Sequence, residues 1–193
     1  MAEEDDEDLR PAYDEETLRR RDAALAQIRQ YGDPVLRSEA RDVEVFDDDL
    51  RREVAWMGQL MDDALGIGLA ATQVGKLRRL LVYRVEHESP VIALVNPRIE
   101  WSGDELETGE EGCLSLPGVH VEVERPVNVR VVARDEHGEE VRVEASGLEA
   151  RVIQHEMDHL DGTLILDRTS RDQRKAAVRA LRERERERDA ATA

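Results

Sequence analysis

The chain has 193 residues, a length typical of one domain with its own hydrophobic core. It carries 45 acidic and 28 basic residues, for a formal net charge of −17, and aromatic residues make up only 3%. A general nucleic-acid binder would show a basic surface or stacking aromatic side chains, so direct DNA binding is not expected. There is no apolar run of membrane-spanning length and no basic N-terminus followed by an apolar stretch, so we expect a soluble, cytoplasmic protein without membrane contact.

The N-terminal residues 1–16 are rich in acids and have no apolar rhythm, so we expect a disordered tail there. The folded domain would then span residues 17–169. Residues 170–193 would form a C-terminal helix followed by a tail.

Two helices are expected early in the domain. Residues 17–30 have apolar side chains at helical spacing, and the turn residues 32–34 would end that helix. Apolar residues between 50 and 65 recur at helical spacing after a run of three aspartates, and Gly66 would end this second helix.

Residues 66–75 form a stretch of small residues, G-I-G-L-A-A-T-Q-V-G. It superficially matches the dinucleotide-binding pattern G-x-G-x-x-A, but that pattern must follow a strand, and here a helix precedes it. We therefore expect a loop in which Gln73 is the polar amide among small and apolar neighbours. Gln73 either completes a turn or points its amide at a reacting oxygen, and the glycines would let a substrate lie against the main chain.

The middle of the chain contains strand-like runs, several of which alternate apolar with polar residues. These runs are residues 79–85, 91–95, 119–124, 127–133 and 140–145. Residues 135–138, D-E-H-G, predict a hairpin turn. Strands grouped between helices with short connections predict an α+β fold, with mostly antiparallel sheets packed around a central helix.

That central helix carries the sequence H-E-M-D-H at residues 155–159. Ser146 and Glu149 match a capping box at its start, and Gly162 supplies a stop. Because apolar residues lie on two sides of it, the helix should be buried. His155 and His159 are four residues apart on one face, so both can reach one metal ion, and Glu156 can take a proton from water at that metal.

A catalytic metal site of this kind needs one more protein ligand, and Cys113 is the candidate. It is the only cysteine in the chain, so it cannot form an internal disulfide, which favours a reducing compartment. A lone cysteine can also be a small buried apolar residue. Gly112 before it and the Pro117-Gly118 turn behind it favour a ligand role, because they let the backbone approach closely and fix the loop.

The three motifs in this order resemble those of the peptide deformylase family: G-x-G-L-A-A-x-Q at Gly66–Gln73, E-G-C-L-S at Glu111–Ser115 and H-E-x-D-H at His155–His159. The resemblance extends from about residue 28 to residue 168. It implies a hydrolase that removes the formyl group from the N-terminal N-formylmethionine of newly synthesised polypeptides, with residues 17–169 as its catalytic domain.

The resemblance also implies roles for single residues. Cys113, His155 and His159 would bind the metal, and Glu156 would be the general base. The Gln73 side-chain amide and the Leu114 backbone N–H would stabilise negative charge on the formyl oxygen. The methionine pocket or peptide groove would be lined by Gly66, Ile67, Gly68, Glu111, Gly112 and Leu148. Fe(2+) would be the ion, with Zn(2+), Ni(2+) or Co(2+) as possible substitutes.

The C-terminal helix, expected over residues 170–189, begins with a stretch rich in Arg and Lys. It is either a solvated terminal helix or, as the resemblance implies, a segment that docks on the ribosome near the exit tunnel. Two alternatives to a deformylase are a metallopeptidase or other metal-dependent amidohydrolase, and a non-enzymatic acidic binding protein. The intact Glu156 and Gln73 argue against the non-enzymatic alternative.

Overall fold

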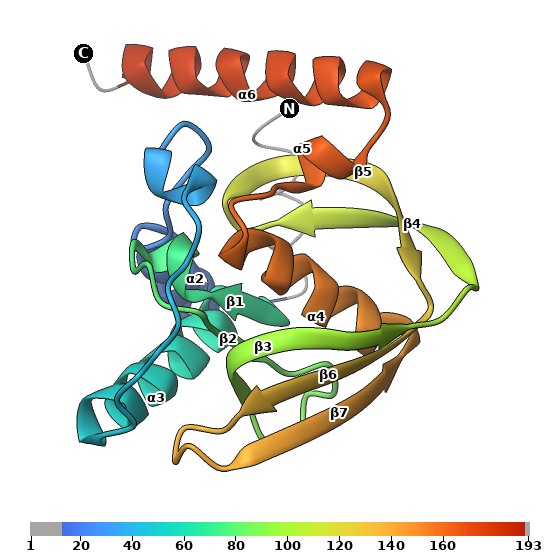
Figure 1. The fold of residues 1–193 in the computed structure, drawn as a ribbon. Helices are drawn as coiled ribbons and strands as arrows, with labels where there is room; N and C mark the ends of the chain where they lie inside the picture. Colours follow the sequence, from blue (N-terminus) through green and yellow to red (C-terminus); the bar gives the residue numbers. More distant parts are fainter. Residues whose placement is uncertain (1–12, 192–193) are drawn as a thin grey trace.

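A computed structural model describes residues 13–191 and has two antiparallel sheets and five α-helices in that part of the chain (Figure 1). The strands are β1 Gly68–Ala70, β2 Leu80–Tyr83, β3 Ile92–Ser102, β4 Leu106–Cys113, β5 Leu116–Pro126, β6 Asn128–Arg134 and β7 Glu140–Ser146. The α-helices are α2 Glu15–Leu25, α3 Asp48–Asp63, α4 Gly147–Leu160, α5 Ile165–Arg168 and α6 Arg171–Ala191. Two short 3-10 helices are η1 Pro34–Arg37 and η2 Ala71–Val74.

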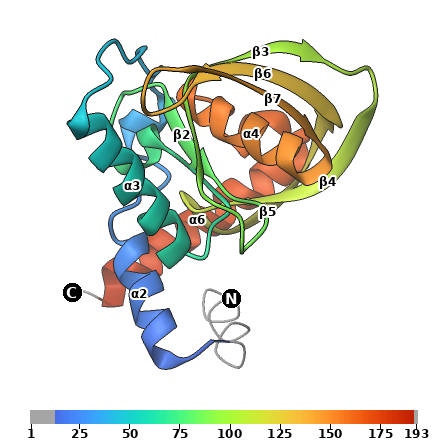
Figure 2. The same cartoon turned by 90° about the horizontal axis from the view of Figure 1, so that it is seen from below.

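Helix α4 lies between the two sheets. The larger sheet has the strand order β1-β2-β3-β6-β7, and the smaller consists of β4 and β5. Figures 1 and 2 show α4 in the hollow of the larger sheet, with the β4–β5 pair on its other side. Its apolar residues Ala150, Ile153 and Leu160 are fully buried in a core shared with β2, β3, β6 and β7. The predicted α+β architecture around a central helix is therefore confirmed.

Helix α3 ends differently from the prediction. Asp47 caps its start, with its side chain accepting from the Leu50 N–H at 3.0 Å. At its other end Leu65, with φ 58°, takes the left-handed position, and the Gly66 N–H donates to the Met61 carbonyl at 2.9 Å. Gly66 is needed for a different reason: a Cβ there would lie 2.9 Å from the side chain of Leu114.

The capping box predicted for α4 is wrong. Ser146 occupies the N-cap position but makes no side-chain cap hydrogen bond. The Glu149 carboxylate instead accepts from the Tyr83 hydroxyl of β2 at 2.9 Å, because that buried hydroxyl needs a partner. The predicted stop is confirmed: α4 ends at Leu160, and Gly162 adopts the left-handed φ of 68°.

Helix α2 is shorter than the predicted helix over residues 17–30. It begins at Glu15, with Asp14 as its cap, and ends at Leu25. Beyond that point, backbone N–H groups of residues 29 and 31 donate to the Gln73 and Ser115 carbonyls at 2.7 and 2.9 Å. Contacts with two distant loops therefore replace the helical hydrogen bonds. The acidic tail was predicted for residues 1–16, of which residues 1–12 lie outside the described part of the chain.

Strand β4 was not predicted, because its sequence L-E-T-G-E-E-G-C has no alternation of apolar and polar residues. It is a strand because it pairs with β5 in a register that places Gly112 opposite His120. The alternating burial of β5, β6 and β7 agrees with the runs predicted for them. The predicted turn over residues 135–138 is confirmed, with the Asp135 side chain accepting two backbone N–H groups at 2.9 Å.

Helix α6 packs along β5, where Ala177 and Leu181 are buried beside Val119, Val121 and Val123. Figure 1 shows it on the side of β5 remote from β6 and β7. Among residues 13–191, no helix combines the length and the apolar character that crossing a membrane requires.

Candidate metal centre

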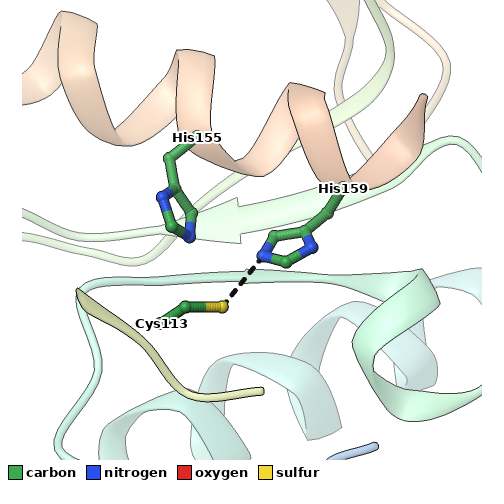
Figure 3. A group of neighbouring side chains, drawn as sticks. All are labelled: Cys113, His155 and His159. Atoms are coloured by element: carbon green, nitrogen blue, oxygen red, sulfur yellow. Dashed lines mark hydrogen bonds between the residues drawn. The ribbon is translucent and has the colours of Figure 1, made fainter. Parts of the chain in front are cut away.

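The three predicted metal ligands converge. Cys113 ends β4, while His155 and His159 lie one turn apart on α4. One possible ligand atom from each lies within 4.8 Å of the other two, and the Cys113 sulfur is 3.2 Å from Nε2 of His159. Figure 3 shows the sulfur facing the two imidazole rings.

The donor set fits a tetrahedral metal site with one open position. Ligand bonds of about 2.3 Å to sulfur and about 2.1 Å to nitrogen would place these two donors about 3.6 Å apart, close to the arrangement here. Burial lowers the pKa of His159 well below its usual value, which keeps this imidazole neutral, as a ligand must be. One cysteine sulfur and two imidazole nitrogens are donors that suit zinc or iron(II).

Glu111 orients His155. Its carboxylate lies 3.0 Å from Nδ1 of that ring, which leaves Nε2 for the metal. Burial alone would raise the pKa of Glu111, but hydrogen bonds from Arg125 and His155 outweigh it and lower the pKa to about 2. Glu111 lines the cavity, as expected, but its side chain is only 4% exposed. Its main contact is therefore with the metal ligand His155 and not with a bound peptide.

Arg125 was missed by the sequence analysis. Its guanidinium donates to both Glu111 oxygens at 2.6 and 2.9 Å and to Asp158 at 2.9 Å, and it is 4% exposed. It thereby connects β5 to the strand of Cys113 and to the helix of both histidines. One signal was present: Val119, Val121 and Val123 mark the buried face of β5, and Arg125 continues that alternation.

Two further arginines, both more exposed than Arg125, pair with the same buried carboxylates. Arg168 donates to both Asp158 oxygens, at 2.5 and 3.1 Å. Arg151 donates to Glu111 at 2.8 Å and to the Val123 carbonyl at 2.9 Å. Each buried carboxylate therefore has more than one cationic partner, which is the condition under which burying such charges is tolerable.

Gln73 is fixed on η2 with its amide nitrogen directed at the metal centre. Its Oε1 accepts from the Ala70 N–H at 2.9 Å, which defines the orientation of the amide. Nε2 then lies 3.2 Å from the Ser115 hydroxyl and 3.7 Å from the Cys113 sulfur. Sequence reasoning named Gln73 but missed Ser115, although Ser115 belongs to the same motif as the cysteine.

Glu156 lies beside the metal centre with its side chain buried. One of its oxygens has no hydrogen-bond partner among the described residues. Burial raises the pKa of Glu156 to about 7, against the opposing influence of His155 and Arg125. Gly68 makes room for it, since a Cβ at that position would lie 2.4 Å from the carboxylate. A carboxylate of this kind can exchange a proton near neutral pH.

A cavity of about 1120 Å³ opens onto Cys113, His155 and Glu156. All six residues predicted to bind substrate line it: Gly66, Ile67, Gly68, Glu111, Gly112 and Leu148. Ile67 and Leu148 are 44% and 56% exposed and offer apolar surface to an incoming side chain. Leu114 lines it too, and its carbonyl accepts from the Gln30 amide at 3.3 Å.

A thiolate, two imidazoles and a buried carboxyl group with a raised pKa, set in one cavity, define a metal-dependent hydrolase. The profile of the family described as polypeptide deformylase matches residues 25–175. The chain therefore belongs to the polypeptide deformylase family.

Relatives and solved structures agree with this assignment. The chain is 44% identical to the peptide deformylase of Parafrankia sp. over 84% of its length and 88% of that protein. A crystal structure of the Synechococcus elongatus peptide deformylase with actinonin superposes with a TM-score of 0.76 at 45% identity, covering 79% of this chain and 85% of that one. The peptide deformylase of Legionella pneumophila gives 0.79 at 38% identity, covering 84% and 96%.

Proposed function

We propose that this chain hydrolyses the formyl amide of N-formylmethionine at the start of newly synthesised polypeptides, using Cys113, His155 and His159 to hold the catalytic ion. The observation that carries the proposal is the buried Glu156 carboxyl, with a pKa of about 7, beside three convergent ligands in an open cavity. The products are formate and a polypeptide with a free α-amino group.

The ion is proposed to be Fe(2+), with Zn(2+), Ni(2+) or Co(2+) as substitutes. One thiolate and two imidazoles bind all of these ions, so the donor set does not select among them. When bound, the ion supplies a Lewis acid that makes water a better nucleophile and polarises the formyl oxygen. Ferrous iron next to a thiolate should make the activity sensitive to oxygen.

Glu156 is proposed to move the proton. Its ionised form accepts a proton from the attacking water, and its protonated form donates that proton to the departing amine. The pKa near 7 suits both halves of this cycle, because neither form of the side chain is strongly disfavoured at neutral pH. Gly68 leaves the space that Glu156 occupies.

Gln73 and Leu114 are proposed to stabilise the negative charge that develops on the formyl oxygen. The Gln73 amide nitrogen already faces the metal centre, because its oxygen is held by the Ala70 N–H. The backbone N–H of Leu114 directly follows the cysteine ligand in the chain. Loss of one such donor typically costs about 3 kcal/mol in transition-state stabilisation.

The methionine side chain is proposed to bind in the cavity against Ile67 and Leu148, both of which line it and are partly exposed. Gly66 and Gly112 keep the walls free of side chains, so the peptide backbone can lie close to them. Specificity for formylmethionine then comes from apolar contacts with the methionine side chain while the formyl group lies at the metal ligands.

A metallopeptidase or another metal-dependent amidohydrolase would use a similar centre, but the family to which the chain belongs does not favour it. The distinguishing assay measures formate release from formyl-Met-Ala-Ser by wild type, Glu156→Ala and Glu156→Gln. Metal content is determined for each. We expect formate from wild type only, with equal metal in all three. If metal-loaded wild type released no formate, the proposal would be wrong.

Helix α6 is proposed to dock on the ribosome near the exit tunnel, which would place the enzyme in the cytoplasm where nascent chains emerge. The proposal divides the chain into two parts. Residues 17–169 form the catalytic domain, and residues 170–193 form the C-terminal helix and tail that would contact the ribosome. Supporting it, the first turns of α6 present Arg171, Arg174 and Lys175 around a surface hollow. Reversing these charges should abolish ribosome co-sedimentation, and unchanged co-sedimentation would contradict docking through α6.

A further inference from the structure

The cavity extends well beyond the space that one formylmethionine needs. Its volume of about 1120 Å³ is slightly above the usual range for small-molecule sites, roughly 300–1,000 Å³. Its far wall comes from two helices outside the three sequence motifs. These wall residues are Arg21, Asp22 and Leu25 of α2 and Leu181, Arg182, Arg184 and Glu185 of α6. An extended peptide advances about 3.3 Å per residue, so a segment of several residues can reach this wall.

The α6 wall is anchored to the body of the protein. Leu181 is 8% exposed and belongs to the core shared with β5. Gln173 accepts from the Glu122 N–H of β5 at 2.7 Å and donates to the Glu122 carboxylate at 3.0 Å. Arg184 donates to the Pro117 carbonyl, four residues after the metal ligand Cys113. The wall therefore has a fixed position relative to the metal centre.

The charge of this wall differs from that of the protein as a whole. The chain has a formal net charge of −17, yet three arginines and two acids line the far end of the cavity. Arg182 is exposed, and it forms no ion pair with any side chain that the structure describes. An exposed, unpaired guanidinium is available to a carboxylate on a bound molecule.

We infer that the far end of the cavity binds the part of the substrate beyond its third residue, and that Arg182 makes the enzyme favour an acidic side chain there. The inference rests on the proposed function, because the formyl end must lie at the metal ligands for the rest of the chain to point toward α6. It adds a specificity-determining residue outside the family motifs.

The test compares C-terminally amidated formyl peptides, so that no terminal carboxylate contributes. One has three residues, formyl-Met-Ala-Ser, and three have six residues with Glu, Ala or Lys at positions four to six. We expect kcat/KM to be about two- to five-fold higher for the Glu peptide than for the Lys peptide, as for an exposed ion pair. The preference should shrink in 0.5 M salt, because screening weakens it.

Arg182→Glu should reverse the preference, and Arg182→Ala should abolish it, with the three-residue peptide unaffected. The matched control is Arg179→Glu, which makes the same charge change on the same helix at a residue that does not line this cavity and is paired with Glu183 at 2.9 Å. This control should keep the wild-type preference.

The outcomes separate the two proposals. Equal kcat/KM for the Glu and Lys peptides in wild type, or an unchanged preference in Arg182→Glu, would overturn the inference while leaving the deformylase activity intact. No formate release from any peptide by metal-loaded enzyme would overturn the proposed function itself. Thermal unfolding midpoints equal to wild type would show that the Arg182 variants keep their fold.

Discussion

Replacing Arg125 with methionine should weaken both the fold and metal binding. The substitution keeps an unbranched, apolar stem of similar reach and removes three charge-assisted hydrogen bonds, two to Glu111 and one to Asp158. Removing one partner of a buried ion pair costs about 3–5 kcal/mol. Here Arg151 and Arg168 still contact the two carboxylates, so we expect the lower end, about 3 kcal/mol.

The effect on the metal follows from Glu111. Without Arg125, the carboxylate that orients His155 loses its bidentate partner, and changes of this kind typically cost about 10–100-fold in metal affinity. The assay is urea unfolding of the metal-free protein, followed by metal titration of the same variant. The control is Arg130→Met on β6, whose ion pair with Glu144 at 3.0 Å is exposed and should contribute at most about 1 kcal/mol.

If Arg125→Met unfolded at the same urea concentration as Arg130→Met and bound metal as tightly as wild type, the reasoning would be refuted. Such a result would mean that the remaining arginines hold Glu111 and Asp158 without help from β5.

Four further predictions concern single groups and the ion. Gly68→Ala should displace the Glu156 carboxylate, since the added Cβ would lie 2.4 Å from it. We expect kcat for formate release to fall at least 100-fold, which corresponds to about 2.7 kcal/mol in activation free energy. A kcat near wild type would contradict this role of Gly68. Gln73→Ala should lower kcat by a similar factor with little change in metal content, and an unchanged kcat would remove its amide from the reaction. The pKa of Asp167 lies below its usual value. Burial alone would raise this pKa, but hydrogen bonds from Arg37 and the Leu164 N–H outweigh the effect of burial. Asp167→Asn should therefore lose up to about 1 kcal/mol at neutral pH, and the difference from wild type should vanish as the pH falls below about 4, as followed by urea unfolding. Chelation of the ion should lower the thermal midpoint by several degrees, because the metal binds the folded state only, and an unchanged midpoint would argue against a bound ion.

The sequence predicted the parts of the centre that depend on local spacing. Two histidines four residues apart share one helical face whatever the fold, so His155 and His159 could be paired from the sequence alone. Burial and polar partners were harder to predict. The hydrogen bond between Glu111 and His155 depends on where β4 lies. The sequence of β4 has no alternation of apolar and polar residues, because most of its side chains face solvent.

Errors at element ends share a physical origin. The predicted stop at Gly66 assumed a local role for that glycine, whereas Leu65 takes the left-handed turn and Gly66 makes room for Leu114. The capping box failed because Glu149 serves the buried Tyr83 hydroxyl. In each case a contact from a distant part of the chain overrides a short-range rule.

The segment between α2 and η1 supports the position of catalytic groups, although none of its own residues has a proposed role in the reaction. The backbone N–H groups of Arg29 and Tyr31 donate hydrogen bonds to the carbonyls of Gln73 on η2 and of Ser115 between β4 and β5. Gln73 on η2 and Leu114, which directly precedes Ser115, are the two proposed oxyanion donors. For protein engineering, a deletion that reaches Arg29 would therefore loosen the catalytic geometry as well as remove the α2 wall of the cavity.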